Sequence, residues 1–245
     1  FPLTYSRVLR LPAEKACEAC DIVLTVGGYG TLLHAARLTM RFGKPILGVN
    51  TGRLGFLTNI ESDELEKLRR LAKWDYQVET RAMLRAEAGE SGTEPCMALN
   101  DVVLFKESPE KTISLDIYCD DIPVSRFRGD GVVFATPTGS TAYSMSVNGP
   151  ILLPQNQNFI LSPVAPHSLN VRPIVIPDDY IITLKVESRT NSFLASLDGR
   201  SEDFPVGTVL KISKAGFSTR VIKRFNQTFY QTLREKLMWG TDVRS

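Results

Sequence analysis

A short apolar run that ends in a glycine turn is the feature that most restricts the fold. Residues 21–26 read Asp-Ile-Val-Leu-Thr-Val, and Gly-Gly-Tyr-Gly-Thr follows at 27–31. β-Branched side chains followed by glycines predict a buried strand and a tight turn. The next residues predict a helix over 32–42, capped by Thr31, and a second strand over 45–49. This strand–helix–strand order predicts a parallel sheet covered by helices, hence an α/β domain.

A change of period near residue 80 predicts a second domain. Before it, a helix is expected to begin near Glu61, capped by Ser62 or Asp63. After it, short runs punctuated by Gly, Pro and Asp predict strands at 76–88, 96–105, 113–118, 122–127, 131–135, 173–176, 180–186, 193–197, 208–212 and 219–222. Apolar residues at a spacing of four predict a final helix over 228–239. We therefore expect an α/β nucleotide-binding domain over 1–80 and a mostly β domain over 81–225.

The charge balance and the cysteines narrow the class of protein. The formal net charge is +2, and no apolar run approaches the ~20 residues that span a bilayer, so we expect neither nucleic acid nor a membrane as a partner. Cys17 and Cys20 form a C-x-x-C, but no second such pair exists and His34 and His167 are the only histidines. We interpret the two cysteines as neighbours on a helix, with reduced thiols, in a cytoplasmic protein.

Two glycine-rich segments are candidate phosphate sites. The turn at 27–31 leads into a helix, whose free N–H groups and partial positive charge suit an anion. An ordinary tight turn explains this segment equally well. The loop at 50–58 follows the second strand, and Arg53 in it is suited to neutralise a phosphate. A solvated surface loop is the alternative there.

Two further segments carry polar residues where apolar ones are expected. Asn100-Asp101 interrupts an apolar run, and an adjacent amide and carboxylate suit the two hydroxyls of a ribose. A strand bulge or an edge strand is the alternative. Arg-Gly-Asp-Gly at 128–131 precedes a strand, and Thr-Pro-Thr-Gly-Ser-Thr-Ala-Tyr-Ser-Met-Ser follows at 136–146. The second of these predicts a nucleotide-binding helix start, with a Ser/Thr-rich loop as the alternative.

Taken in this order, the four segments resemble those of the NAD kinase family of bacterial type, which uses ATP or polyphosphate. The similarity runs from about residue 21 to residue 200. A glycine turn alone also resembles lipid kinases and phosphofructokinases. Its combination with Leu-Gly-Phe-Leu at 54–57, Asn100-Asp101 and the segment at 136–143 is specific to NAD kinases. The resemblance implies a phosphotransferase that moves a phosphoryl group from ATP to the adenosine ribose 2′-hydroxyl of NAD.

The resemblance also implies roles for single residues. It implies NAD contacts at Gly30, Asn100, Asp101, Lys111, Arg128, Asp130, Thr141, Ala142, Tyr143, Ser144, Met145, Ser146, Ala165 and Arg200. From the two glycine-rich segments we expect contacts to ATP and its phosphates at Gly27, Gly28, Thr31, Asn50 and Arg53. Mg²⁺ is expected to arrive with ATP, without ligands from the protein. Family members form homo-oligomers, dimers or tetramers, in which neighbouring subunits help complete the NAD site. Their last helix, here within 226–245, packs back on the first domain.

The chain departs from the family at the catalytic position. Tyr29 stands where the family has the aspartate that acts as general base toward the ribose hydroxyl. A tyrosine has a reference pKa of ~10 and is almost wholly protonated at pH 7. Loss of a general base typically costs ~100- to 10,000-fold in rate. Positioning and electrostatics still leave room for residual phosphoryl transfer.

The chain also departs from the family at its beginning. Only 20 residues precede Asp21, whereas family members carry an opening strand and helix there, so we expect an incomplete first sheet.

The main hypothesis is an NAD kinase in which Gly30 and Asn100 converge on one dinucleotide between the domains. The alternatives are a catalytically silent protein that binds NAD or NADP, and a lipid kinase of related architecture.

Overall fold

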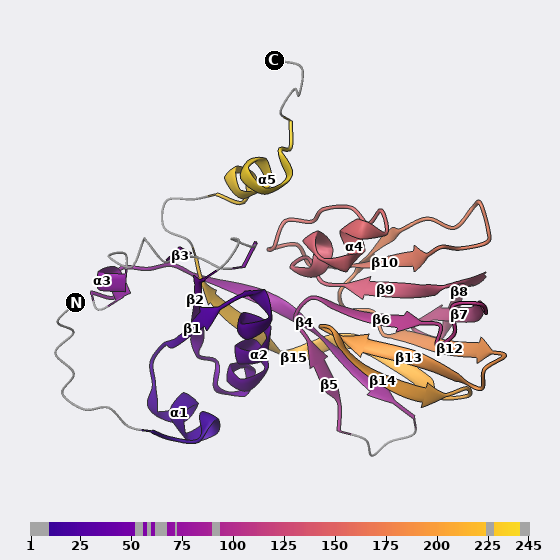
Figure 1. The fold of residues 1–245 in the computed structure, drawn as a ribbon, viewed down its shortest axis with the longest axis horizontal. Coiled ribbons are helices and arrows are strands. Elements are labelled where there is room, and N and C mark those ends of the chain that lie inside the picture. Colours follow the sequence, from indigo (N-terminus) through magenta and orange to yellow (C-terminus); the bar gives the residue numbers. More distant parts are fainter. Residues whose placement is uncertain are drawn as a thin grey trace. The chain divides into compact units, whose positions relative to one another are not determined.

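The chain forms two compact units in the computed structural model. Residues 10–51, 56–57, 60–61, 68–71, 73–89, 94–223 and 228–240 are described. Unit 1 contains the chain up to Glu79 together with 220–225, and unit 2 contains 80–219 and 226–245 (Figure 1).

Unit 1 is an α/β unit built on parallel strands. Its elements are α1 (Ala13–Ala19), β1 (Val23–Gly27), α2 (Tyr29–Thr39), the 3₁₀ turn η1 (Met40–Phe42), β2 (Pro45–Asn50), β3 (Ile60–Glu61) and α3 (Leu68–Leu71). Strand β2 pairs in parallel with β1 and with β3. Every residue of β2 is buried. The predicted parallel sheet with covering helices is therefore confirmed.

The start of α2 differs from the prediction. The helix begins at Tyr29, inside the glycine turn, and its N-cap is Gly28, which offers no side chain. Thr31 was expected to cap the helix but lies within its first turn, so that expectation is wrong. Gly43 ends the helical segment in the left-handed conformation, with φ of 59°, as a glycine can without strain. The predicted caps Ser62 and Asp63 lie outside the described residues.

Unit 2 is a sandwich of two β-sheets. Its elements are β4 (Val78–Ala88), β5 (Cys96–Ala98), β6 (Asp101–Phe105), β7 (Ile113–Cys119), β8 (Ile122–Gly129), β9 (Gly131–Ala135), the 3₁₀ turn η3 (Gly139–Thr141), α4 (Tyr143–Ser146), β10 (Asn158–Val164), β11 (Ile174–Pro177), β12 (Ile182–Ser188), β13 (Ser192–Leu197), β14 (Arg200–Pro205), β15 (Val209–Ile222) and α5 (Phe229–Leu237). One sheet has the order β11-β10-β9-β6-β13-β14. The other joins β8, β7, β12 and β15, with β4 beside β15 and β5 beside β4.

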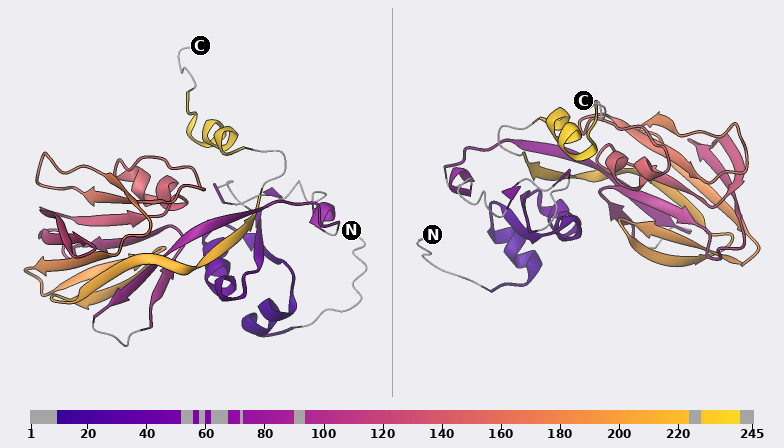
Figure 2. Two further views of the ribbon diagram at one scale, coloured as in Figure 1. Left: turned by 180° about the vertical axis from the view of Figure 1, so that it is seen from behind. Right: turned by 45° about the horizontal axis from the view of Figure 1, so that its top comes forward.

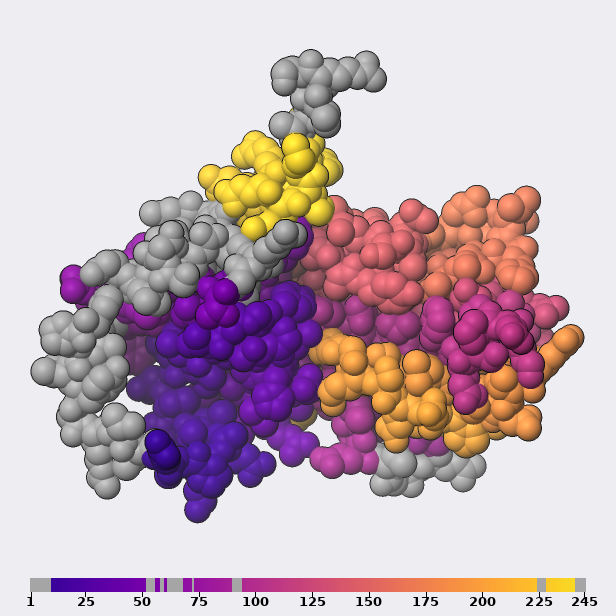
Figure 3. Space-filling model, in the orientation of Figure 1, coloured from indigo at the N-terminus to yellow at the C-terminus, as the bar shows by residue number. Residues whose placement is uncertain are grey.

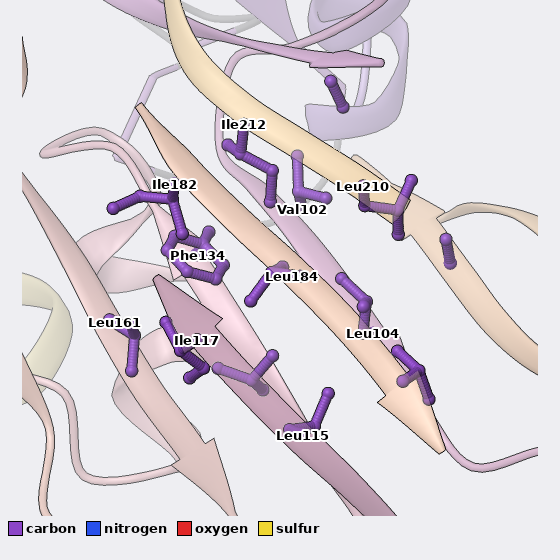
Figure 4. Close-up of a cluster of buried hydrophobic side chains, with 14 of the residues drawn as sticks. Val102, Leu104, Leu115, Ile117, Phe134, Leu161, Ile182, Leu184, Leu210 and Ile212 are labelled. Atoms are coloured by element: carbon purple, nitrogen blue, oxygen red, sulfur yellow. The ribbon is translucent and has the colours of Figure 1, made fainter. Parts of the chain in front are cut away.

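The core of unit 2 lies between these sheets. Figure 4 shows apolar side chains from both sheets facing one another across it. The labelled side chains of the first sheet are Val102, Leu104, Phe134 and Leu161, and those of the second are Leu115, Ile117, Ile182, Leu184, Leu210 and Ile212. Most of them are fully buried, so they form the apolar core that holds the two sheets, and the loops between their strands, in place.

Several strands differ from the sequence-based prediction. Strands β10 and β14 were not expected, and the two strands predicted at 208–212 and 219–222 are one strand, β15. The strand predicted over 96–105 is broken into β5 and β6 at Leu99 and Asn100. Figure 2 shows the long strands β4 and β15 side by side, as their pairing requires. Both strands contain residues of unit 1 and of unit 2.

The chain ends in the predicted helix. Thr228 is the N-cap of α5 and forms a capping box with Gln231, in which each side chain binds the backbone of the other residue. The expected return of this helix to the first domain stays a prediction. In the part of the chain that the structure describes, no helix is long and apolar enough to cross a membrane.

Candidate active site

The glycine turn of unit 1 is closely packed against its own helix. Gly27 has φ of 152°, and a Cβ on it would lie 2.5 Å from Oγ1 of Thr31. The Thr31 N–H donates to the Gly28 carbonyl at 3.1 Å. Tyr29, the first residue of α2, is half-buried and Gly30 is exposed. A side chain at position 27 would be strained at this φ and would meet the Thr31 side chain, so glycine suits the turn that leads into the helix.

Asn50 lies beside this turn. It is the last residue of β2 and pairs with Gly27 of β1, so both are at the carboxyl end of the parallel strands. Its side chain is buried. Ligands of open α/β sheets bind at this edge. Two candidate phosphate segments thus lie together within unit 1, while Arg53, predicted for the same site, lies outside the described residues.

In unit 2, Asn100 lies in the break between β5 and β6, and Asp101 is the first residue of β6. They are 4% and 6% exposed. The carboxylate of Asp198 accepts the backbone N–H of Leu99 and of Asn100 at 2.8 Å each, and that of Asp101 at 3.3 Å. The Asp198 N–H donates to the Asp101 carbonyl at 3.1 Å. One side chain therefore gathers three consecutive donors at the point where the strand is interrupted.

A second segment closes on the same break. The Thr136 hydroxyl donates to the Leu99 carbonyl at 2.6 Å, and the Thr136 N–H donates to the Asn100 carbonyl at 2.9 Å. A Cβ on Gly139 would lie 2.0 Å from the Asn100 carbonyl oxygen. The structure thus brings the segments at 100–101 and 136–146, distant in sequence, into direct contact.

The electrostatics of this contact favour a proton on Asp101. Burial and the nearby carboxylate of Asp198 raise the pKa of Asp101 to about 7, and a hydrogen bond from the Tyr143 backbone acts in the opposite direction. A carboxyl group with such a pKa titrates near neutral pH. Perturbed carboxyls of this kind are typical of ligand sites.

The rest of the 136–146 segment forms η3 and α4, as expected of a helix start. Tyr143 is 39% exposed and opens α4. Ser144 is buried, with its Oγ 3.4 Å from that of Ser162. The predicted contact residues Thr141, Ala142 and Met145 are half-buried and Ser146 is exposed. The Tyr143 side chain is therefore partly exposed, while the Ser144 side chain is buried against Ser162.

A second group of predicted residues lies at the other end of the same strands. Asp130 accepts an ion pair from Lys106 at 2.7 Å, and its N–H donates to the Val164 carbonyl, next to Ala165. The Arg128 guanidinium donates to Thr112, the neighbour of the exposed Lys111.

The strand register separates this group from the first. Asp101 pairs with Ala135 at one end of β6 and Phe105 pairs with Gly131 at the other. Four residues at ~3.3 Å each separate the two ends by roughly 13 Å. The predicted NAD contacts of unit 2 thus form two groups. Strands β6 and β9, which join the two groups, are themselves buried apart from the half-buried Phe105. Figure 3 shows one face of the molecule, with residues of unit 2 in magenta, pink and orange.

Comparison with known proteins identifies the family. The model of the ATP-NAD kinase N-terminal domain matches residues 5–75, and that of the ATP-NAD kinase C-terminal domain matches residues 99–224. NAD kinase of Bacteroides fragilis is 46% identical over 226 residues, which are 91% of this chain and 78% of that protein. NAD kinase of Porphyromonas gingivalis is 43% identical over 228 residues, covering 93% and 79%. The chain belongs to the NAD kinase family.

Solved NAD kinases share the fold as well. Yeast NADH kinase complexed with NADH superposes with a TM-score of 0.86 at 28% identity, over 95% of this chain and 70% of that one. NAD kinase from Archaeoglobus fulgidus in complex with ATP gives 0.78 at 31% identity, over 95% and 88%. The predicted family, two-domain fold and NAD kinase function are confirmed, and the lipid-kinase alternative is set aside. Members of the family are phosphotransferases.

Two features of this NAD kinase escaped the sequence-based search. Asp198 is not among the predicted contacts, although it lies two residues before Arg200, whose guanidinium donates to the Met97 carbonyl at 3.1 Å. The dipeptide Asp198-Gly199 is a signal for a hairpin turn and was the available clue. Arg81, 8% exposed, donates to the Thr138 hydroxyl at 3.3 Å and carried no signal in the sequence.

Within the described ranges, no three His, Cys, Asp or Glu side chains lie close enough together to hold a metal ion. Mg²⁺ in kinases is usually held by substrate phosphates with one or two carboxylates rather than by a cage of protein ligands. The residues of the glycine turn fit that arrangement, because they offer backbone N–H groups to phosphate.

Proposed function

We propose that the pair Asn100-Asp101 binds the adenosine ribose of NAD, and that the glycine turn with Asn50 receives the phosphates of ATP. The observation that carries the proposal is the burial of this pair together with the hydrogen bonds to its backbone. Both residues are buried next to a strand break; Asp198 accepts the backbone N–H of each, and the Thr136 N–H donates to the Asn100 carbonyl. A buried amide and carboxylate gain stability when a ligand's hydroxyls become their partners.

The proposed reaction moves one phosphoryl group. The 2′-oxygen of the adenosine ribose bonds to the γ-phosphorus of ATP, the bond from that phosphorus to the β,γ-bridging oxygen breaks, and ADP leaves. The hydroxyl proton needs an acceptor as the new bond forms. Tyr29 replaces the anionic acceptor of the family with a phenol, so we expect proton removal to be the impaired step. Mg²⁺ bound with ATP supplies neutralisation of phosphate charge.

We propose that the remaining NAD contacts come from both groups of predicted residues in unit 2, one at each end of β6. Tyr143 and its neighbours in 141–146 would line the nucleotide beside Asn100, with Arg200 and Gly30 as further contacts. Lys111, Arg128, Asp130 and Ala165 would bind another part of the dinucleotide. Their roughly 13 Å offset along the strands fits a site completed by a neighbouring subunit of a homo-oligomer. A cytoplasmic location fits the four free cysteines.

Two measurements test the proposal. NAD binding is titrated calorimetrically, and NADP formation from NAD, Mg²⁺ and ATP or polyphosphate is followed in a coupled assay. We expect binding, with turnover well below that of a family member that carries aspartate. Absence of NAD binding at millimolar ligand would contradict the proposed site. Binding without any product, even for Tyr29→Asp, would instead indicate a silent NAD-binding protein.

A further inference from the structure

The turn between β13 and β14 places a carboxylate against the backbone of the proposed ribose site. Leu197 pairs with Arg200, so Asp198 and Gly199 form a two-residue hairpin loop. Both have positive φ, 48° and 79°, as a tight hairpin of this kind requires. The loop is therefore closed by the sheet itself, and the direction of the Asp198 side chain follows from the strand pairing.

This carboxylate accepts three consecutive backbone N–H groups at and next to the strand break. One oxygen, Oδ2, accepts the N–H of Leu99, and the other, Oδ1, accepts those of Asn100 and Asp101. Hydrogen bonds to an ionised acceptor are shorter and stronger than neutral ones. Three of them on consecutive residues fix the orientation of the peptide planes, and hence the direction in which each side chain leaves the backbone.

We infer that Asp198 is a positioning residue of the NAD site, which sets the orientation of Asn100 and Asp101 toward the ribose through their backbone N–H groups. The inference rests on the proposed function, because it needs these two residues to contact NAD. Asp198 acts through them rather than on the reacting atoms. Its second effect is electrostatic, since its charge faces Asp101.

Two substitutions weaken or remove the hydrogen bonds that the Asp198 carboxylate accepts, without straining the hairpin turn. In Asp198→Asn, one side-chain oxygen still accepts from Asn100 and Asp101, but the amide NH₂ faces the Leu99 N–H, donor against donor. Asp198→Gly removes the side chain altogether, and glycine adopts positive φ freely. Both variants keep the hairpin loop compatible with its backbone.

The β7–β8 hairpin provides a matched control. Asp120 and Asp121 form a two-residue loop with φ of 47° and 64°, between the paired residues Cys119 and Ile122. Asp120 also uses its carboxylate to accept one backbone N–H, that of Ile181, at 2.9 Å. Asp120→Asn and Asp120→Gly therefore repeat the same chemical changes in the same kind of turn, on a hairpin of the other sheet.

The test is calorimetric titration of the variants with NAD at pH 8, where Asp101 is mostly ionised. We expect Asp198→Asn to raise the Kd for NAD roughly tenfold or more, as loss of a hydrogen bond to a charged group would, and Asp198→Gly to raise it further. The Asp120 variants should bind like the wild type. A Kd within twofold of wild type for both Asp198 variants would overturn the inference.

A second readout separates positioning from general loss of structure. Removing the charge of Asp198 should move the pH midpoint of NAD binding downward in Asp198→Asn, while Asp120→Asn leaves it in place. An unmoved midpoint, or an equal loss of binding in both pairs of variants, would contradict the role. If the wild type itself fails to bind NAD, the proposed function fails; if it binds and only the Asp198 effect is missing, the inference alone fails.

Discussion

Tyr29 opens α2, where the partial positive charge of the helix favours a carboxylate and gives a phenol no comparable stabilisation. We predict that Tyr29→Asp raises the rate of NADP formation at least ~10-fold, because a general base is worth ~100- to 10,000-fold in rate. The coupled assay at saturating NAD and ATP measures this change in kcat.

Tyr29→Asn is the matched control for that substitution. Asparagine has nearly the size of aspartate but no negative charge, so it removes the bulk of the ring without supplying a base. We expect its rate to stay near that of the parent chain. If Tyr29→Asn activates the enzyme as strongly as Tyr29→Asp, steric relief rather than proton removal explains the gain, and residue 29 is not at the base position.

The carboxyl group of Asp101 should make NAD affinity depend on pH. Its pKa is raised to about 7 by burial and by Asp198, so it is mostly neutral below pH 7 and ionised above. A carboxylate accepts hydrogen bonds from both ribose hydroxyls, whereas a protonated carboxyl offers less acceptor capacity. We predict that NAD affinity rises as pH increases from 6 to 8, measured by calorimetry, and that Asp101→Asn flattens this profile. Affinity that falls with increasing pH would contradict the assignment.

At the scale of elements, η3 lies close to the strand break, and a glycine-to-alanine substitution, which adds one methyl group, tests this contact. A Cβ on Gly139 would lie 2.0 Å from the Asn100 carbonyl oxygen, whereas one on Gly216 of β15 would meet nothing within 4 Å. We predict that Gly139→Ala costs roughly 1–3 kcal/mol in unfolding free energy and weakens NAD binding, because backbone atoms must move. Gly216→Ala should lie within ~0.5 kcal/mol of the parent. Urea denaturation compares the unfolding free energies of the two variants. Equal values would contradict the close contact between Gly139 and the Asn100 carbonyl.

The same elements show how far local sequence determined the prediction. Strand β9 was predicted with its observed bounds because its apolar run sits between Gly131 and a proline. Strand β10 was missed because it contains Pro163, which usually argues against an interior strand. In the structure Pro163 lies beyond Leu161, the last residue of β10 that pairs with β11, so its lack of an N–H removes no bond on that side. Such compensation depends on where a neighbouring strand ends, which local patterns do not contain.

The candidate site shows the same limit over longer distances. The pair Asn100-Asp101 was recognisable because two polar residues interrupt an apolar run. Its anchor, Asp198, lies nearly 100 residues further along the chain and becomes visible only when β13 is placed beside β6. Sequence patterns find residues that are chemically unusual at their own position. They miss a common residue such as Asp198, whose importance comes from what the fold places against it.

At the scale of the whole molecule, the separation of the two groups of proposed NAD contacts leads to a test with mixed subunits. Asn100→Ala damages the group at one end of β6 and Asp130→Ala damages the group at the other. If one NAD site takes Asn100 from one subunit and Asp130 from a neighbour, a mixed oligomer contains sites with both residues intact. Random pairing in a symmetric dimer then leaves about one quarter of all sites undamaged.

The two variants are mixed under conditions that exchange subunits, and NAD-binding stoichiometry is measured by calorimetry, which does not depend on turnover and hence not on Tyr29. Each variant alone should bind NAD weakly, and the mixture should recover roughly a quarter of wild-type sites at wild-type affinity. Light scattering establishes that oligomers form. If both groups belong to one subunit, every site in the mixture carries one substitution and no tight sites return. Recovery therefore distinguishes a shared site from two ends of a single-subunit site, whichever oligomer the chain forms.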